Sequence, residues 1–337
     1  MTNTALRDWR TCRVVESRTV TPRARRITLE RPVPLGRPAA PGSHVDVRVR
    51  LGEGPLAATD IRSYSVVESD PTGTLLTLTV QLAEHSRGGS AHLHSLRVGD
   101  TVEATRPLQD FPLLAGADGY VLLAGGIGVT ALVGAARALA RLETDYRLVY
   151  VGRSRASMAY VDLLQAEHGP RLELHVDDEG TALDVEALVH EVAGAPGRRE
   201  LLMCGPVRLM DAVRRAWQSA DLSPVDLRFE TFGNSGWYDA EPFEVCLPEQ
   251  GVEAVVAPDQ TMLEALSAAG ADVMWDCRKG ECGLCLMSVT DLTGRLDHRD
   301  VFLSDAQQQG GRQVCVCVAR VVANAGAGPA RVTLAFA

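Results

Sequence analysis

The sequence lacks the features of a nucleic-acid-binding, secreted or membrane-spanning protein. Its net charge of −9 leaves no dominant basic surface, which excludes the usual footprint of nucleic-acid binding. Lysine occurs once, at Lys279, beside 33 arginines, which is a habit of composition without a mechanism attached. The first ten residues contain no apolar stretch after their charges, so no export signal is visible. We therefore expect a cytoplasmic protein with neither a nucleic acid nor a membrane as partner.

One uncharged stretch has the length of a membrane-spanning helix. Residues 119–136 contain no charged side chain, but five of them are glycine. Because these glycines separate a β-type run from a helical run, the stretch indicates strand, turn and helix in a soluble domain. With 337 residues, 46% hydrophobic and 23% charged, the chain has the composition of a globular protein of two or three domains.

The pattern of apolar residues changes twice along the chain. Residues 1–112 show short alternating runs broken by Gly, Pro, Asp and Ser, which predict a small antiparallel β-barrel. Residues 113–231 alternate apolar strands with helical runs, including a helix over 156–167, which predicts an α/β domain with a parallel sheet. The chain is therefore multidomain.

The last third of the chain begins with a predicted linker. Residues 232–242 are rich in Gly, Asn and Pro, and residues 243–337 form the final α+β domain. Thr261 and Glu264 are spaced as a capping box at the start of a helix that ends near Gly270.

Five of the eight cysteines lie in the last 61 residues, and three of them have a distinctive spacing. Cys277, Cys282 and Cys285 form a C-x4-C-x2-C pattern followed by a distant cysteine, the plant-type ligand pattern of a [2Fe-2S] cluster. Each iron shares two bridging sulfides and needs two thiolates. Structural zinc and reduced structural thiols are the alternatives, and zinc prefers paired knuckles to one arc of three ligands. The spacing therefore predicts an iron-sulfur centre.

Two further motifs suit phosphate binding, each with a structural alternative. Gly125, Gly126, Gly128 and Thr130 lie between a predicted strand and a helix, where glycines let phosphates approach the backbone. Cys204-Gly205-Pro206 follows another strand, and in an open parallel sheet both turns would lie at the carboxyl edge. A tight packing turn and a buried apolar cysteine are the other interpretations.

The predicted barrel contains a third motif. Arg62-Ser63-Tyr64-Ser65 on a strand would place Arg62 and Tyr64 on one face and the serines on the other. Arg87-Gly88-Gly89-Ser90 precedes a possible helix and could form an amide nest for a phosphate. A polar edge strand and a surface turn are the simpler interpretation of these residues.

Taken together, these motifs resemble the phthalate dioxygenase reductase family, within the ferredoxin-NADP reductase superfamily. The resemblance covers nearly the whole chain and implies a flavin barrel, a nicotinamide domain and a plant-type β-grasp ferredoxin domain in that order. It implies an NADH-dependent reductase that uses FMN and a [2Fe-2S] cluster. Nicotinamide gives a hydride and the cluster accepts single electrons, so a flavin is needed between them. The implied acceptor is a Rieske-type oxygenase or a cytochrome P450.

The resemblance also implies roles for individual residues. Residues in the FMN site would be Arg62, Ser63, Tyr64, Ser65, Thr79, Val80, Gln81, Gly88, Gly89, Ser90, Phe229 and Glu230. Residues facing the dinucleotide would be Gly125, Gly126, Gly128, Thr130, Cys204, Gly205 and Pro206. We assign the catalytic roles to Cys204 and Ser65, and the cluster to Cys277, Cys282, Cys285 and Cys317.

Several alternatives remain open at the level of sequence. Cys315 competes with Cys317 as fourth ligand, and Cys317 is favoured because Val-Ala-Arg follows it, as in the family's Cys-Val-Ala or Cys-Val-Ser string. If residues 314–322 form one strand, both cysteines share a face. NADPH could replace NADH, since Arg153 and Arg155 follow a strand where a 2′-phosphate could be met. The chain could also use FAD, or serve as an electron-transfer subunit without turnover of its own.

Overall fold

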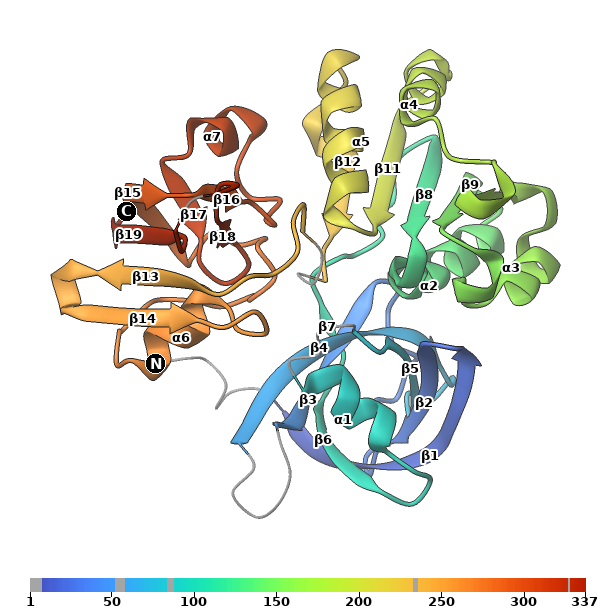
Figure 1. Cartoon of the computed structure of the whole chain (residues 1–337). Helices are drawn as coiled ribbons and strands as arrows, with labels where there is room; N and C mark the ends of the chain where they lie inside the picture. Colours follow the sequence, from blue (N-terminus) through green and yellow to red (C-terminus); the bar gives the residue numbers. More distant parts are fainter. Residues whose placement is uncertain (1–7, 52–57, 84–87, 233–235, 327) are drawn as a thin grey trace. The chain divides into compact units, whose positions relative to one another are not determined.

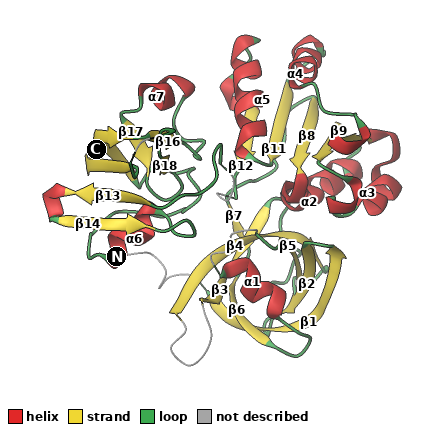
Figure 2. Ribbon diagram, in the orientation of Figure 1, coloured by secondary structure: helices red, strands yellow, loops and turns green. Residues whose placement is uncertain are grey.

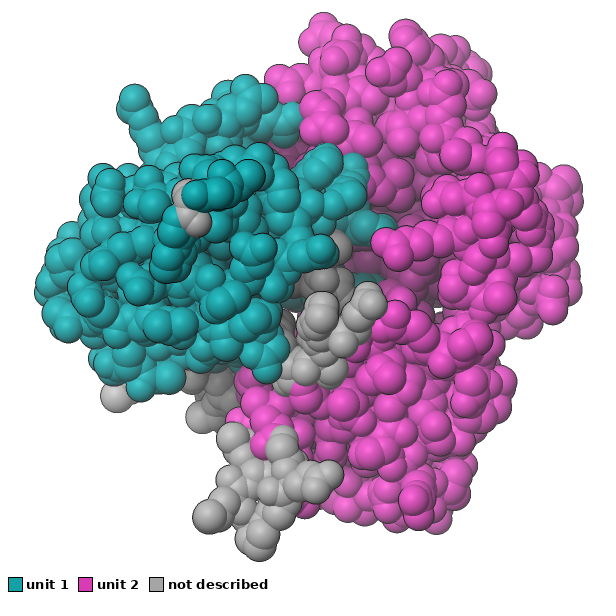
Figure 3. Space-filling model, viewed as in Figure 1, with its two compact units in different colours: residues 1–2, 206–208, 231–337 teal, residues 3–205, 209–230 magenta. Residues whose placement is uncertain are grey.

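The computed structural model describes residues 8–51, 58–83, 88–232, 236–326 and 328–337. The described residues divide into two compact units, coloured separately in Figure 3. One unit comprises residues 206–208 and 231–337, and the other lies within residues 8–205 and 209–230. The larger unit holds both a barrel and a parallel sheet.

The barrel is antiparallel and closed by strands far apart in sequence. Its strands follow the order β4-β5-β2-β1-β6-β3-β7, and an added pairing of β3 with β4 completes the ring (Figure 1). The elements are β1 (Trp9–Thr21), β2 (Ala24–Glu30), β3 (Ser43–Leu51), β4 (Ala58–Ser69), β5 (Leu75–Gln81), α1 (Gly89–Ser95), β6 (Thr101–Thr105) and β7 (Leu108–Gln109). The predicted barrel is confirmed.

Alternation along the strands fills the barrel. Ile27 and Leu29 on β2 and Leu78 on β5 are fully buried in the barrel core. The residues that alternate with them along each strand lie on the outer face of the barrel. Val80 belongs to the same core, so its side chain points away from the outer face where Thr79 lies. Only the backbone of Val80 is therefore available to a ligand on that outer face.

The α/β part of the larger unit is a parallel sheet with the order β10-β9-β8-β11-β12. Figure 2 shows its strands interleaved with helices along the chain. The elements are β8 (Gly119–Gly125), α2 (Val129–Arg141), β9 (Asp145–Gly152), α3 (Val161–His168), β10 (Leu172–Val176), α4 (Val185–Gly194), β11 (Arg199–Cys204), α5 (Val207–Ser219) and β12 (Leu227–Glu230). The order reverses between β8 and β11, which is where ligands bind in open α/β sheets.

One predicted helix in this sheet is shorter than expected. The apolar pattern predicts a helix over 156–167, but α3 begins at Val161. Tyr160 has a left-handed backbone with φ of 67°, which ends any helix that would run through it. Residues 155–157 instead form a separate 3-10 turn, so the chain makes a loop between β9 and α3.

The smaller unit contains a mixed five-stranded sheet of order β14-β13-β19-β15-β17 and a two-stranded pair of β16 and β18. The elements are β13 (Phe243–Leu247), β14 (Val252–Val256), α6 (Met262–Ala268), β15 (Leu286–Thr293), β16 (Arg295–Asp297), α7 (Asp305–Gly310), β17 (Gln313–Cys315), β18 (Arg320–Val322) and β19 (Arg331–Phe336). The expected α+β class is confirmed, and the capping box joins Thr261 and Glu264 as predicted.

The predicted linker lies in the same unit. Residues 233–235 lie outside the described residues. The amide of Trp237 donates to the Asp297 carboxylate at 2.9 Å, and Arg299 donates to the Tyr238 carbonyl at 3.1 Å. The second half of the predicted linker is therefore hydrogen-bonded to the segment around β16. Among the described residues, no helix combines the length and apolar character needed to cross a membrane.

Candidate functional site

The two phosphate-binding candidates of the α/β sheet meet at its carboxyl edge. Gly128 follows β8, and a side chain there would collide with the carbonyl of Cys204 and lie 2.9 Å from the amide nitrogen of Gly205. A Cβ on Gly205 would in turn lie 3.0 Å from the Cα of Gly125. Only glycine allows this close approach of two turns, so the glycines serve packing as well as any ligand.

Thr130 and Cys204 are both buried at this edge. The Thr130 hydroxyl donates to the Ile127 carbonyl at 2.9 Å, which fixes the turn before α2. Cys204 is fully buried, as the simpler interpretation of a small apolar residue requires. Its place at the end of β11 nevertheless puts it beside β12, where Cys204 pairs with Glu230 across the parallel sheet.

Ser65 of the barrel reaches the same edge. Its hydroxyl donates to the Glu230 carboxylate at 3.5 Å, although the two residues are 165 positions apart. Both side chains are buried, and Glu230 is 3% exposed. Ser65, Cys204, Glu230 and the Gly126–Gly128 turn therefore converge, and the name carboxyl edge is kept for this group.

The barrel motif assembles as its alternation predicts. A Cβ on Gly89 would lie 2.8 Å from the Cγ of Arg62 and 3.3 Å from the Tyr64 hydroxyl, so the start of α1 packs directly on these two side chains. Ser63 points the other way and donates to the buried carboxylate of Asp46 at 2.6 Å. The two segments that resembled a flavin site in the sequence are thus adjacent.

The remaining barrel candidates are placed less uniformly. The Arg62 guanidinium pairs with Asp60 and also donates to the Ile61 carbonyl at 3.0 Å. Burial raises the pKa of the Tyr64 hydroxyl, and the nearby Arg62 only partly offsets this. Gln81 is exposed at the end of β5. Ser90 accepts a hydrogen bond from the Ala83 amide at 3.1 Å, and Arg87 lies outside the described residues.

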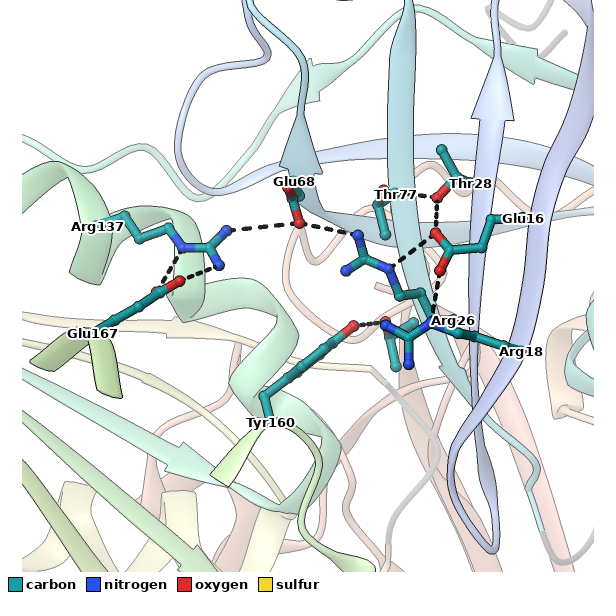
Figure 4. A network of polar contacts seen from close by, with 10 residues as sticks. Glu16, Arg18, Arg26, Thr28, Glu68, Thr77, Arg137, Tyr160 and Glu167 are labelled. Carbon is teal, nitrogen blue, oxygen red and sulfur yellow. Dashed lines mark hydrogen bonds and ion pairs between the residues drawn. The ribbon is translucent and has the colours of Figure 1, made fainter. Parts of the chain in front are cut away.

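A polar network that the sequence did not reveal joins the barrel to α2 and α3 of the α/β part (Figure 4). Arg26 donates to Glu16 at 3.2 Å and to Glu68 at 3.0 Å. Glu68 also pairs at 3.9 Å with Arg137 of α2, which holds Glu167 of α3 through two bonds of 2.8 Å. This network borders an open pocket of about 880 Å³.

Tyr160 adds an uncharged link beside these ion pairs. Its hydroxyl bonds to the hydroxyl of Thr79 on β5, with its ring directed toward the barrel in Figure 4. Such half-exposed contacts are individually weak, but together they fix one barrel face against α2 and α3. No local pattern could have revealed them, because the partners lie tens of residues apart in sequence.

The three closely spaced cysteines lie on a tight loop, named here the cysteine loop, Cys277–Cys285. The amides of Lys279 and Glu281 point at the Cys277 sulfur, at 3.4 and 3.5 Å. Gly280 has φ of 77°, and a Cβ there would lie 2.8 Å from the Cα of Asp300. Amides directed at sulfur are the environment of an iron-sulfur ligand, so the loop fits the cluster that its spacing predicts.

The more distant cysteines approach this loop unequally. A bond from the Cys317 thiol, opposed by burial, lowers the pKa of Cys277 to about 5. Bonds from Cys315 and then Cys317 lower the pKa of Cys285 to about 3. Cys317 is thus hydrogen-bonded to both Cys277 and Cys285, whereas Cys315 is hydrogen-bonded to Cys285 alone. These bonds, together with burial, raise the pKa of Cys315 and the pKa of Cys317.

The backbone also separates the two candidates for the fourth ligand. Residues 314–322 are not one strand, because β17 ends at Cys315 and the amides of Val318 and Ala319 bond back to the Cys315 carbonyl. Cys317 lies in the turn that follows, so the two cysteines do not share a strand face. Among the described residues, no three His, Cys, Asp or Glu side chains are grouped as ligands of a single metal ion. A two-iron cluster instead needs only two thiolates on each iron.

Comparison with known proteins agrees with this geometry. Residues 247–322 match the model of the 2Fe-2S iron-sulfur cluster binding domain. The chain is 36% identical to the phenoxybenzoate dioxygenase subunit beta of Ectopseudomonas oleovorans over 279 residues, 82% of this chain and 83% of that protein. It also superposes on phthalate dioxygenase reductase with a TM-score of 0.71 and 28% identity, over 97% of this chain and 98% of that one.

A self-sufficient cytochrome P450 monooxygenase of type IV contains a similar region. The identity is 33% and the TM-score 0.62, over 97% of the chain described here. The match spans only 41% of that longer protein. The likeness is therefore to one part of the P450 protein.

Proposed function

Since this chain belongs to the phthalate dioxygenase reductase family, we propose that it is an NADH-dependent reductase of an oxygenase system. It passes electrons from NADH through FMN and a [2Fe-2S] cluster, one at a time, to an oxygenase component. The observation that carries the proposal is the convergence of Ser65, Glu230 and Cys204 at the carboxyl edge. A barrel serine there meets a sheet that is built to bind a nucleotide.

The carboxyl edge would orient the reduced nicotinamide. The turn at Gly125, Gly126 and Gly128 offers backbone amides at the start of α2, which favour a pyrophosphate. Cys204, Gly205 and Pro206 form the opposite side of the same edge, and the buried positions of Cys204 and Glu230 keep water from it. Ser65 supplies a hydroxyl that can hydrogen-bond to the reacting pair.

The barrel would hold the FMN. Arg62, Ser63, Tyr64 and Ser65 on β4 and Thr79, Val80 and Gln81 on β5 would border the ring, with Phe229 and Glu230 beside it. Gly88, Gly89 and Ser90 at the start of α1 would meet the phosphate. The close approach of Gly89 to Arg62 and Tyr64 supports this assignment, because it brings the proposed phosphate-binding segment beside the strand that would border the ring.

The cysteine loop would hold the cluster through Cys277, Cys282, Cys285 and Cys317. When bound, the flavin takes up a hydride and the cluster carries single electrons. The amides of Lys279 and Glu281 would stabilise negative charge on the sulfurs. We propose a cytoplasmic location, because the eight cysteines form no disulfide with one another, as is usual in a reducing compartment.

The acceptor is proposed to be a Rieske-type oxygenase or a cytochrome P450. The similarity to phthalate dioxygenase reductase and to the phenoxybenzoate dioxygenase subunit supports the first class. The similarity to part of the self-sufficient cytochrome P450 supports the second. An electron-transfer subunit without turnover is the second candidate, because the match to a 2Fe-2S cluster binding domain over residues 247–322 fits that role equally well.

Turnover by the purified holoprotein tests the proposal. We expect NADH to reduce ferricyanide and cytochrome c catalytically, with a visible spectrum of flavin plus iron-sulfur cluster. Flavin released by denaturation and separated by chromatography should be FMN, and FAD would contradict that part. A spectrum that is bleached by dithionite but not by NADH would leave only the subunit role.

A further inference from the structure

The loop that follows β9 carries two arginines at the carboxyl end of the nucleotide sheet. Arg153 and Arg155 come directly after the strand, and both are exposed. In sheets of this kind, the residues after the second strand meet the adenosine ribose of the coenzyme, and an arginine there accommodates a 2′-phosphate. On this loop alone, the chain would be expected to accept NADPH.

The next strand brings a carboxylate onto one of these arginines. Glu179 follows β10 on a 3-10 turn, and its two oxygens accept from the Nε and Nη2 atoms of Arg155, each at 2.8 Å. This two-bond geometry is the one an arginine would use for a phosphate, so the carboxylate and the phosphate compete for the same face of the guanidinium.

The surroundings of the pair are acidic. Asp177 and Asp178 precede Glu179 on the same turn, and Asp162 of α3 also acts on Arg155. The bond from Arg155 holds the pKa of the Glu179 carboxyl below its ordinary value, so Glu179 is charged at neutral pH. Three successive carboxylates repel a phosphate dianion that approaches this turn.

Backbone contacts keep the two loops together. The last residues of β9 and β10, Gly152 and Val176, are partners in the sheet, and the Asp178 amide donates to the Arg153 carbonyl at 3.1 Å. The carboxylate is thus presented to Arg155 by the sheet itself rather than by a free loop. Arg155 also lines the pocket beside Tyr160 and is half-exposed, so a ligand has access to it.

We infer that Glu179 is a specificity-determining residue, which selects NADH over NADPH by occupying the guanidinium of Arg155. The inference deepens the proposed function and rests on it for the identity of the coenzyme. A 2′-phosphate would have to displace a charged carboxylate from a two-bond contact, whereas a 2′-hydroxyl makes no such demand. Arg155 is therefore present, but its guanidinium is already bonded to the Glu179 carboxylate.

The test is Glu179→Gln in the full-length holoprotein, with two readouts. The first is the ratio of kcat/KM for NADPH to that for NADH. The second is the ratio of affinities for adenosine 2′,5′-bisphosphate and adenosine 5′-monophosphate, measured by titration calorimetry. Because the pair is solvent-exposed, we expect each ratio to rise by roughly 3- to 10-fold.

Two further variants make the result specific. Glu179→Gln combined with Arg155→Gln should lose the gain, because the freed arginine is then absent. Glu173→Gln is the matched control. Glu173 on β10 pairs with Arg147 on β9 at 2.9 Å, and its side chain is 43% exposed, against 41% for that of Glu179. This control should leave both ratios unchanged.

Unchanged ratios in Glu179→Gln would overturn the inference, as would a gain that persists without Arg155. The nucleotide fragments contain no nicotinamide, so their binding decides the inference even if the wild type fails to oxidise NADH. Failure of NADH oxidation in the wild type would instead contradict the proposed function.

Discussion

The cysteine loop places three proposed ligands within nine residues, whereas the carboxyl edge collects its polar groups from segments up to 165 residues apart. In the loop, backbone amides and positive-φ glycines shape one short stretch of chain around the sulfurs. At the carboxyl edge, a barrel strand and three sheet strands must each arrive in register. A locally built site should fail completely when one ligand is lost, and an assembled site should weaken by degrees.

The largest expected effect is loss of the cluster from the cysteine loop. Cys317→Ser should abolish or strongly perturb the cluster, because Cys317 contacts both Cys277 and Cys285. Cys315→Ser should keep it, since Cys315 ends β17 and is fully buried. Visible absorbance and the reduced-state EPR signal measure both variants, and the reverse result would make Cys315 the fourth ligand.

The next effect concerns the tightest point of the carboxyl edge. Gly128→Ala would push a methyl group into the Cys204 carbonyl, and overpacking of this kind costs about 1–3 kcal/mol. Displacement of the turn by about an ångström should lower kcat/KM for NADH by roughly 100-fold.

Stopped-flow reduction by NADH and thermal melting measure this change. Gly194→Ala is the control, since it lies at the end of α4 with nothing within 4 Å of the added atom. Equal turnover in Gly128→Ala and the wild type would show that the contact between the two turns does not position the coenzyme.

The two sites also differ in how far sequence could predict them. The cysteine spacing and the capping box at Thr261 depend on neighbouring residues, so the pattern alone located them. The contact of Ser65 with Glu230 depends on how a barrel docks on a sheet, which spacing does not encode. Family resemblance supplied both residues, but their contact is visible only in the structure.

Two departures of the structure from the apolar pattern have equally local causes. Tyr160 fits an apolar helical pattern, yet its left-handed backbone and its bond to Thr79 begin α3 five residues later than predicted. Residues 314–322 alternate like a strand, but carbonyl bonds back to Cys315 turn the chain before Cys317. In both places a backbone hydrogen-bonding or tertiary contact overrides the apolar period.

A smaller effect compares two serines on one strand. Ser65→Ala removes the hydroxyl that meets Glu230, and we expect hydride transfer from NADH to slow roughly five- to tenfold, the worth of one hydrogen bond. Ser63→Ala leaves the buried Asp46 carboxylate without its 2.6 Å bond and should lower the melting temperature more than Ser65→Ala does.

Stopped-flow spectroscopy and thermal melting separate the two roles. If the hydride-transfer rate falls equally in both variants, the carboxyl edge does not single out Ser65. If only Ser65→Ala slows transfer, the assembled site contains a residue with a graded contribution, as the comparison requires.

The smallest effect is acid sensitivity of the network that holds the barrel against α2 and α3. Burial opposes ionisation of Glu16, but bonds from Thr28, Arg18 and Arg26 outweigh it and lower the pKa of Glu16 from 4.5 to about 2. A lowered carboxyl pKa stabilises the folded state above the unfolded value of 4.5, and this stability is lost as the pH falls toward 2. Because the side chain is 34% exposed, the contribution is about 1 kcal/mol.

Glu16→Gln should therefore lower the melting temperature at pH 7 slightly and flatten the fall of the melting temperature below about pH 4.5. Glu103→Gln is the control, because the Glu103 carboxylate pairs with Arg48 at 2.8 Å elsewhere on the barrel. Flavin fluorescence during melting reports the barrel, and an undiminished acid slope in Glu16→Gln would assign the sensitivity to other carboxylates.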